Sequence, residues 1–181
     1  ADEGVLTMPV AINVSAIQFH SFDFPELLGR IMEETGAEPR CIEVEVTEGI
    51  LMRDIEATVR TLTRLKEMGV ALAVDDFGTG YSSLNYLRRF PLDRLKVDKS
   101  FIRDMEVDAA DRTITEAIIG LGKSLGLRVI AEGVETRAEM SLLRERECED
   151  VQGFIYAEPM PPDELAVWYR TFEYERRGTP H

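Results

Sequence analysis

Cysteine and histidine are almost absent from this sequence. The 181 residues include two cysteines, Cys41 and Cys148, and two histidines, His20 and His181. Two distant cysteines form neither a disulfide framework nor a CxxC metal motif, and two histidines exclude a histidine cluster, a zinc site and a Ser/His/Asp triad. Any chemistry must therefore use carboxylates, amides or lysine, and the cysteine usage fits a reducing compartment.

Basic runs and long apolar runs are missing as well. The chain has 21 Lys and Arg residues against 34 Asp and Glu residues, and its net charge of −13 excludes a broad binding surface for nucleic-acid polymers or anionic lipid. No apolar stretch approaches the roughly 20 residues that cross a bilayer, so we expect no membrane insertion by this segment and a cytoplasmic location. The chain starts at Ala1 rather than Met. We interpret it as a fragment, and tethering to a membrane through upstream segments stays open.

What the sequence does contain is a repeated pattern of helical stretches, glycines and short apolar runs. In the clearest copy a helix face that includes Ile55 and Leu65 ends at Gly69, and the apolar run 70–74 follows directly. Six strands are predicted in this way, at 10–14, 42–46, 70–74, 95–97, 128–131 and 150–154. The alternation predicts an α/β domain over residues 1–172, either a closed barrel or an open doubly wound sheet, followed by a frayed tail at 173–181.

Polar side chains stand at the carboxyl end of every predicted strand. They are Asn13, then Glu45 and Glu48, Asp75 and Asp76, Lys96 and Asp98, Glu132 and Glu135, and Gln152. Because residues two apart share a face of a strand, Asn13, Glu45, Asp75 and Lys96 all point away from the apolar residues that face the helices. The carboxyl ends of parallel strands meet at one edge of the sheet, so we expect these groups to converge at one site.

This set of side chains predicts a site for hard cations. Several carboxylates in a narrow mouth repel one another unless cations compensate them, and oxygen ligands without His or Cys select Mg²⁺, Mn²⁺ or Ca²⁺. Two such ions bridged by Asp75 and Asp76 suit phosphodiester hydrolysis. Lys96 would hold the attacking water or neutralise developing negative charge, and Glu132 would accept the proton of that water. A single carboxylate after a strand is more often a helix N-cap or a solvated loop charge. The alternative interpretation of Lys96 is a structural ion pair.

Residues 77–84 have the glycine content of a phosphate-binding loop, but lack the third glycine of a dinucleotide fingerprint and the lysine of a P-loop. The alternative interpretation is a flexible strand-to-helix loop that gates the site, with Ser82 or Ser83 as the N-cap of the next helix.

Six motifs together resemble one known family. They are Asn13-Val14-Ser15, Glu45-Val46-Thr47-Glu48, the run from Asp75 to Leu84 (DDFGTGYSSL), Lys96-Val97-Asp98, the run from Ala131 to Glu135 (AEGVE) and Gln152-Gly153. In this order and spacing they resemble the EAL domain of bacterial signalling proteins. The resemblance implies a (β/α)₈ TIM-barrel-like fold, here with about six of eight strand units. It also implies hydrolysis of cyclic di-GMP to linear pGpG with two Mg²⁺ or Mn²⁺ ions.

The resemblance also assigns roles to residues. Those implied as metal ligands are Asn13, Glu45, Asp75 and Asp76; those implied as catalytic are Glu132 and Lys96; those implied to bind substrate are Gln152, Asp98 and Glu135; and Glu48 is implied to steady the loop after Asp76. A homodimer near that loop and regulatory domains upstream of the chain are implied as well.

The sequence departs from the family pattern at one point. The Glu-Ala-Leu strand, which supplies a further metal-ligating glutamate, is absent from this chain. Three interpretations therefore stand: a cyclic di-GMP phosphodiesterase, a cyclic di-GMP receptor without turnover, and a protein-interaction module with a silent site.

Overall fold

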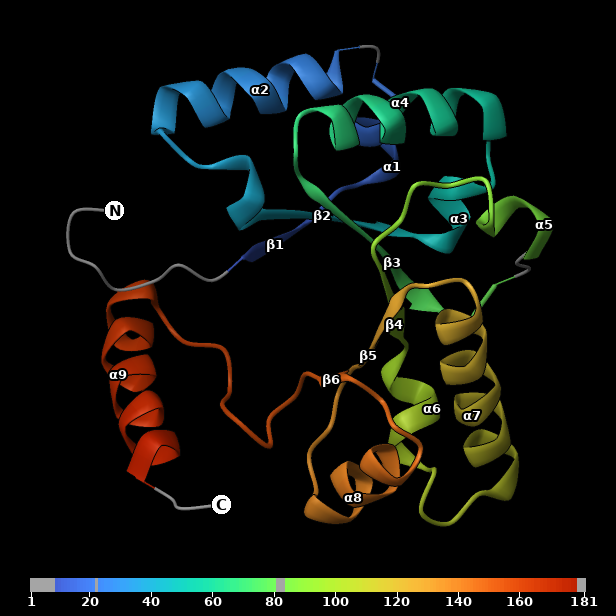
Figure 1. The fold of residues 1–181 in the computed structure, drawn as a ribbon, viewed down its shortest axis with the longest axis vertical. Helices are drawn as coiled ribbons and strands as arrows, with labels where there is room; N and C mark the ends of the chain where they lie inside the picture. Colours follow the sequence, from blue (N-terminus) through green and yellow to red (C-terminus); the bar gives the residue numbers. More distant parts are fainter. Residues whose placement is uncertain (1–8, 22, 81–83, 179–181) are drawn as a thin grey trace. The chain divides into compact units, whose positions relative to one another are not determined.

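The computed structural model describes residues 9–21, 23–80 and 84–178 (Figure 1). The described residues divide into two compact units, 9–156 and 157–178. The strands are β1 Val10–Asn13, β2 Ile42–Thr47, β3 Ala71–Phe77, β4 Arg94–Val97, β5 Arg128–Ala131 and β6 Asp150–Val151. The helices are α1 Ala16–Phe19, α2 Phe24–Thr35, the 3₁₀ helix η1 Pro39–Cys41, α3 Glu48–Leu51, α4 Ile55–Glu67, α5 Leu84–Leu87, α6 Lys99–Arg103, α7 Ala109–Ser124, α8 Arg137–Glu145 and α9 Pro162–Gly178.

All six described strands form one curled parallel sheet in the order β1-β2-β3-β4-β5-β6 (Figure 1). A doubly wound sheet reverses its strand order at a switch point, whereas a barrel adds each strand beside the previous one. The order within the described residues follows the barrel rule throughout. The sequence left these two architectures open, and the strand order decides for a partial barrel.

Helix α4 illustrates how the chain forms each repeating unit. Asp54 begins the helix by accepting a hydrogen bond from the Ala57 N–H at 3.0 Å, and Gly69 follows its end with a φ of 90°, a left-handed value that suits glycine. The helix buries Leu62 and Leu65 and packs on β3, while α7 packs on β4 and β5 (Figure 1). The helices thus cover one face of the sheet, which we call the outer face.

The outer face carries the hydrophobic core. Val44, Leu72, Val74, Leu95 and Val129 are fully buried there, at 0% exposure. The residues between them in each strand point to the opposite face, which we call the inner face. This is the alternation that the sequence predicts.

Three sequence-based predictions of element bounds were wrong. The strand predicted at 70–74 runs from Ala71 to Phe77 and so ends three residues late. Strand β6 contains only Asp150 and Val151, so the predicted strand at 150–154 ends three residues early, because the chain turns at Gly153 toward Val134. The tail predicted to fray from residue 173 instead continues helix α9 to Gly178, and residues 179–181 lie outside the described residues. No helix in the described ranges combines the length and hydropathy that a membrane span requires.

Candidate active site

A β-bulge in β3 places two neighbouring carboxylates on the same side of the sheet. Val74 pairs with Leu95 and Phe77 with Val97, so Asp75 and Asp76 together stand opposite one residue of β4. Asp76 has a φ of 52°, a left-handed value that is uncommon outside glycine but accessible to aspartate. Strict alternation would point Asp76 to the outer face. The bulge instead lets both carboxylates reach the mouth of the sheet.

Lys96 on β4 lies at the centre of the site. Its Nζ is 2.7 Å from Glu45 Oε1, 3.2 Å from Asp75 Oδ1 and 2.6 Å from Glu132 Oε1. The side chains of Lys96 and Glu45 are 3% and 4% exposed. We call these four residues the Lys96 cluster. The sequence predicted their convergence, and the structure confirms that neighbouring strands bring them together.

The site holds more negative charge than its lysine can neutralise. Carboxylate oxygens of Asp75, Asp76 and Glu132 lie within 4.8 Å of one another, close enough to share a cation. Asp75 Oδ1 is buried and forms no hydrogen bond, although it faces the Lys96 ammonium. This all-oxygen donor set fits a hard divalent cation.

The charges of the Lys96 cluster shift one another's protonation. Burial alone lowers the pKa of Lys96, but its hydrogen bonds to Glu132 and Glu45 outweigh burial and hold that pKa above its usual value. Burial raises the pKa of Glu132, and the nearby charges of Asp75 and Glu45 act in the same direction against the opposing effect of Lys96. Lys96 is therefore a permanent cation, whereas Glu132 binds a proton more readily than an ordinary glutamate.

Asp98 links the site to the start of helix α6. Its Oδ1 accepts a hydrogen bond from the Ser100 N–H at 2.9 Å, the N-cap geometry that the sequence offered as an alternative interpretation of the carboxylates. Burial opposes the ionised form, but the hydrogen bonds from Ser100 and Asp76 lower the pKa of Asp98. Burial, the charge of Asp75 and the contact with Asp98 all raise the pKa of Asp76.

Glu48 lies buried beneath the loop that follows the bulge. Its Oε2 accepts a hydrogen bond from the Gly78 N–H at 3.4 Å. A Cβ at Gly80 would stand 3.0 Å from Glu48 Oε1, an oxygen that is buried without a hydrogen bond. This placement agrees with the role in supporting the loop that the resemblance implies. The Ser82 or Ser83 N-cap lies outside the described residues.

The remaining predicted site residues lie at the surface, outside the Lys96 cluster. Asn13 is exposed on the edge strand β1, in register with Glu45. Gln152 and Glu135 are also exposed. Their backbones are fixed, because the Gln152 N–H donates to Ala131 O at 2.8 Å and the Glu135 N–H donates to the Glu139 carboxylate at 2.8 Å.

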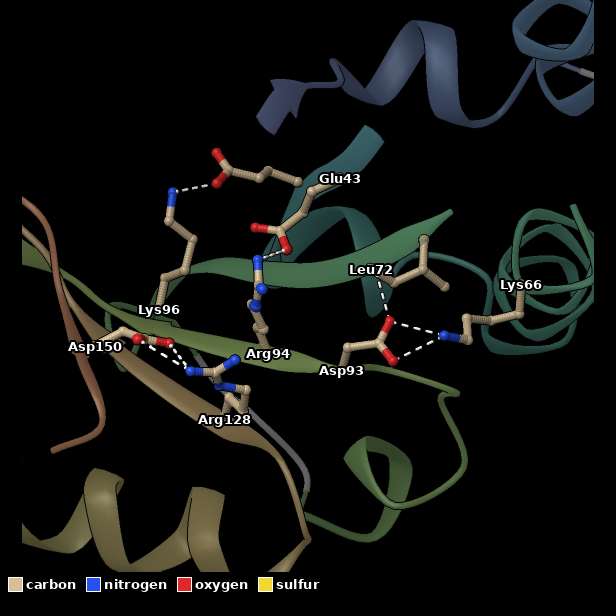
Figure 2. A network of polar contacts seen from close by, with 9 residues as sticks. Glu43, Lys66, Leu72, Asp93, Arg94, Lys96, Arg128 and Asp150 are labelled. Atoms are coloured by element: carbon tan, nitrogen blue, oxygen red, sulfur yellow. Dashed lines mark hydrogen bonds and ion pairs between the residues drawn. The ribbon is translucent and has the colours of Figure 1, made fainter. Parts of the chain in front are cut away.

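Sequence reasoning missed a second ionic layer on the inner face (Figure 2). Arg94 on β4 pairs with Glu43 on β2, and Arg128 on β5 lies 3.0 Å from Asp150 on β6. Burial raises the pKa of Glu43, although Arg94 opposes the effect. Glu43 and Arg94 each stand two positions before a member of the Lys96 cluster, so the same alternation would have found them.

The fold and the site define a class of protein: a barrel-type α/β domain with an acidic cation site at the carboxyl ends of its strands. A family model described as "EAL domain" matches residues 3–159. The chain belongs to the EAL domain family, as its sequence motifs predicted.

Individual relatives support this assignment. The chain is 44% identical over 166 residues to the cyclic di-GMP phosphodiesterase NbdA of Pseudomonas aeruginosa, covering 92% of this chain and 21% of that protein. The structure titled "PaMucR Phosphodiesterase, c-di-GMP complex" is 41% identical with a TM-score of 0.87, covering 91% of this chain and 66% of that one. A manganese and cyclic di-GMP complex of Klebsiella pneumoniae BlrP1 is 32% identical with a TM-score of 0.77, covering 87% of this chain and 40% of that one. The chain thus spans about a fifth of NbdA.

Proposed function

We propose that this chain is a metal-dependent phosphodiesterase domain that hydrolyses cyclic di-GMP to linear pGpG in bacterial second-messenger signalling. The observation that carries the proposal is the Lys96 cluster, whose Asp75 and Glu132 lie together with Asp76 close enough to share a cation. A similar protein named as a cyclic di-GMP phosphodiesterase and a similar phosphodiesterase structure with cyclic di-GMP bound support the choice of substrate.

The cofactor in this proposal is Mg²⁺ or Mn²⁺, with two ions at the mouth of the sheet. Asp75 and Asp76 would hold them together with Glu45 and Asn13, and the manganese complex of BlrP1 supports this choice of metal. When bound, such ions polarise the scissile phosphate and lower the pKa of a coordinated water. The excess of carboxylates over lysine in the site supplies the negative charge that two divalent ions need.

The chain's own residues would handle the protons and the developing charge. Hydrolysis adds one water across one phosphodiester bond, and Glu132 would accept a proton from the attacking water, a task that suits a carboxylate with a raised pKa. Lys96 remains charged, so it would orient that water and Glu132 and offset negative charge as it develops on the phosphate.

The remaining residues would serve the substrate and the loop. Gln152, Asp98 and Glu135 would contact cyclic di-GMP, and Glu48 would steady the loop that begins at Gly78. The catalytic domain would comprise residues 1–172. We further propose a cytoplasmic homodimer with upstream regulatory domains. The length of NbdA, of which this chain covers 21%, supports the further domains alone.

A receptor that binds cyclic di-GMP without turnover is the second candidate. It is favoured by Asn13, an implied metal ligand that is exposed on the edge strand β1 rather than joined to the Lys96 cluster. Loss of one oxygen ligand weakens the binding of a hard cation.

Chromatography of cyclic di-GMP incubated with the chain and Mn²⁺ or Mg²⁺ tests the proposal. The wild type is compared with Glu132→Gln and with Glu67→Gln, a matched control at an exposed position on α4. We expect pGpG from the wild type and from Glu67→Gln, and none from Glu132→Gln. Nucleotide binding by calorimetry without any product would favour the receptor, and absence of both binding and product would overturn both candidates.

A further inference from the structure

A second ion pair lies next to the Lys96 cluster on the inner face, toward the amino ends of β2 and β4. Its carboxylate, Glu43, is buried, and its cation, Arg94, is 23% exposed. Arg94 and Lys96 share the inner face of β4, and Glu43 and Glu45 share the inner face of β2. Each cation reaches across the intervening strand β3 to one carboxylate, Arg94 to Glu43 and Lys96 to Glu45. Figure 2 shows Arg94 extending across the sheet toward Glu43. The small side chains of Ala71 and Ala73 on β3 leave room for both crossings.

The register of the sheet makes a different pairing available. Arg94 is in register with Ala73 on β3, and Ala73 is in register with Glu45 on β2. Across these paired residues the carboxylate that lies level with Arg94 is therefore Glu45. Arg94 nevertheless pairs with Glu43, two residues before Glu45 on β2. This diagonal pairing leaves Glu45 to the Lys96 ammonium.

Removal of either Arg94 or Glu43 alone should change the ion-pair partners of Lys96. Glu43 is 3% exposed, and without Arg94 its charge would be buried with Lys96 as the nearest remaining cation of the site. Without Glu43, the guanidinium of Arg94 would be free to turn to Glu45, which lies level with it across β3. Both single losses change the partners of Lys96, whereas loss of the whole pair does not.

We propose that Arg94 and Glu43 form a positioning pair that keeps Lys96 bound to Glu45, Asp75 and Glu132. The pair touches neither substrate nor water in this role and acts through Lys96 alone. The catalytic part of the inference rests on the proposed phosphodiesterase function. The part that concerns the partners of Lys96 does not.

A double-mutant cycle tests the pair through turnover of cyclic di-GMP with Mn²⁺. We expect Arg94→Met and Glu43→Gln each to lower kcat by about 10- to 100-fold, the range found when groups that orient active-site ligands are lost. KM should change by less than kcat. The double variant should recover to within about threefold of the wild type, because it removes both the unpaired charge and its competitor. Arg94→Lys keeps the cation and should retain most of the activity.

Arg128→Met is the matched control. Arg128 is in register with Arg94 on the neighbouring strand and pairs with Asp150, but its side chain is 57% exposed and its partner lies away from Glu45. Its loss should change kcat by no more than about twofold. If the two single losses are additive in the double variant, or if the single variants match the wild type, the positioning role is wrong.

A second readout separates this inference from the proposed function. The ¹⁵N signal of the Lys96 ammonium, assigned by its loss in Lys96→Arg, reports on its hydrogen-bond partners whether or not the chain has activity. We expect this signal to shift in Arg94→Met and in Glu43→Gln and to return in the double variant. A signal that stays unchanged in both folded single variants would overturn the inference even if the wild type hydrolyses cyclic di-GMP. If the wild type is inactive, the same shifts would support the pair and contradict only the enzyme.

Discussion

The two ends of the sheet handle charge in opposite ways. At the amino end of β4, Asp93 is matched by Lys66, whose Nζ lies 2.8 Å away, and also accepts a hydrogen bond from the Leu72 N–H at 2.8 Å (Figure 2). At the carboxyl end, Lys96 faces three carboxylates, and a fourth, Asp76, lies beside them. At the amino end one lysine matches one aspartate, and both side chains are about one-third exposed. At the carboxyl end the Lys96 and Glu45 side chains are buried, and the carboxylates outnumber the single ammonium.

This difference separates ion pairs that hold the fold from groups assembled for a task. A pair such as Lys66 and Asp93 joins α4 to β4 and satisfies a backbone donor. A buried excess of like charges raises the free energy of the folded chain and persists where a ligand or a reaction requires it. The comparison therefore predicts effects of different size, and in one case of different sign, at the two ends.

Removal of the central cation should have the largest effect. Lys96→Met leaves Glu45, Asp75 and Glu132 buried without a positive partner, and loss of one member of a buried ionic network costs about 3–5 kcal/mol. We expect hydrolysis of cyclic di-GMP to fall below detection and the unfolding midpoint in urea to fall sharply. Saturating Mn²⁺ should restore part of the lost stability, because metal binding compensates the same carboxylates.

Lys66→Met is the matched control at the amino end. Its ion pair with Asp93 is about one-third exposed, so its loss should cost no more than about 1 kcal/mol and should leave hydrolysis unchanged. Equal losses of stability for the two lysine variants would contradict the distinction between the two ends.

A glycine at the carboxyl end should give the next largest effect. A Cβ at Gly153 would stand 2.1 Å from Val134 O and 2.4 Å from Val134 N, both backbone atoms that cannot move aside alone. We expect Gly153→Ala to lower stability by about 1–3 kcal/mol and to reduce hydrolysis, because the loops that carry Glu132 and Gln152 must separate. Thermal unfolding and product chromatography measure the two effects.

Gly120 on helix α7 provides the contrast for this substitution. Nothing lies within 4 Å of a Cβ built there, so Gly120→Ala should be neutral or should stabilise the helix by up to about 1 kcal/mol. If Gly153→Ala proved as stable as Gly120→Ala, the close approach of the two loops would not constrain the site.

Much of the site could be predicted from strand periodicity alone. The alternation of apolar residues predicted that Glu45, Asp75 and Lys96 share the inner face, since one-residue steps along a strand reverse the face. The position of Asp76 could not be predicted in this way, because it depends on a bulge that exists only in the pairing of β3 with β4. The repeated sequence pattern also made β6 too long, since its end is set by a contact of Gly153 with the backbone of Val134, which is distant in the sequence.

At the amino end, a charge removed from a balanced pair should be mildly destabilising. Asp93→Asn loses the charge that attracts Lys66, but its amide oxygen still accepts the hydrogen bond from the Leu72 N–H. We expect a loss of about 1 kcal/mol by urea unfolding and hydrolysis within about twofold of the wild type. A loss of activity as large as that of Lys96→Met would show that the amino end also serves the reaction.

The smallest effect should have the opposite sign. Asp76→Asn removes one charge from the carboxylate group at the mouth, and asparagine, like aspartate, tolerates the left-handed φ of 52° at this bulge. We expect the metal-free variant, measured in EDTA at neutral pH, to melt higher than the wild type by less than about 4 °C, since 1 kcal/mol corresponds to roughly 2–4 °C in a chain of this size. Hydrolysis should nevertheless be lost.

The pH dependence fixes the cause of this gain. Burial and the charge of Asp75 raise the pKa of Asp76 above its usual 3.8, so the folded chain binds this proton more tightly than the unfolded chain. The stabilisation from that bound proton is full below pH 3.8 and is lost as the pH rises through the raised value. The melting temperature of Asp76→Asn should therefore rise relative to that of the wild type as the pH increases from 3.8 through the raised pKa. At higher pH the difference in melting temperature should stay constant. A difference in melting temperature that stays constant over the whole pH range would assign the gain to backbone conformation at the bulge instead of charge. Saturating Mn²⁺ should reverse the order of the two proteins, because only the wild type keeps the Asp76 carboxylate for the cation.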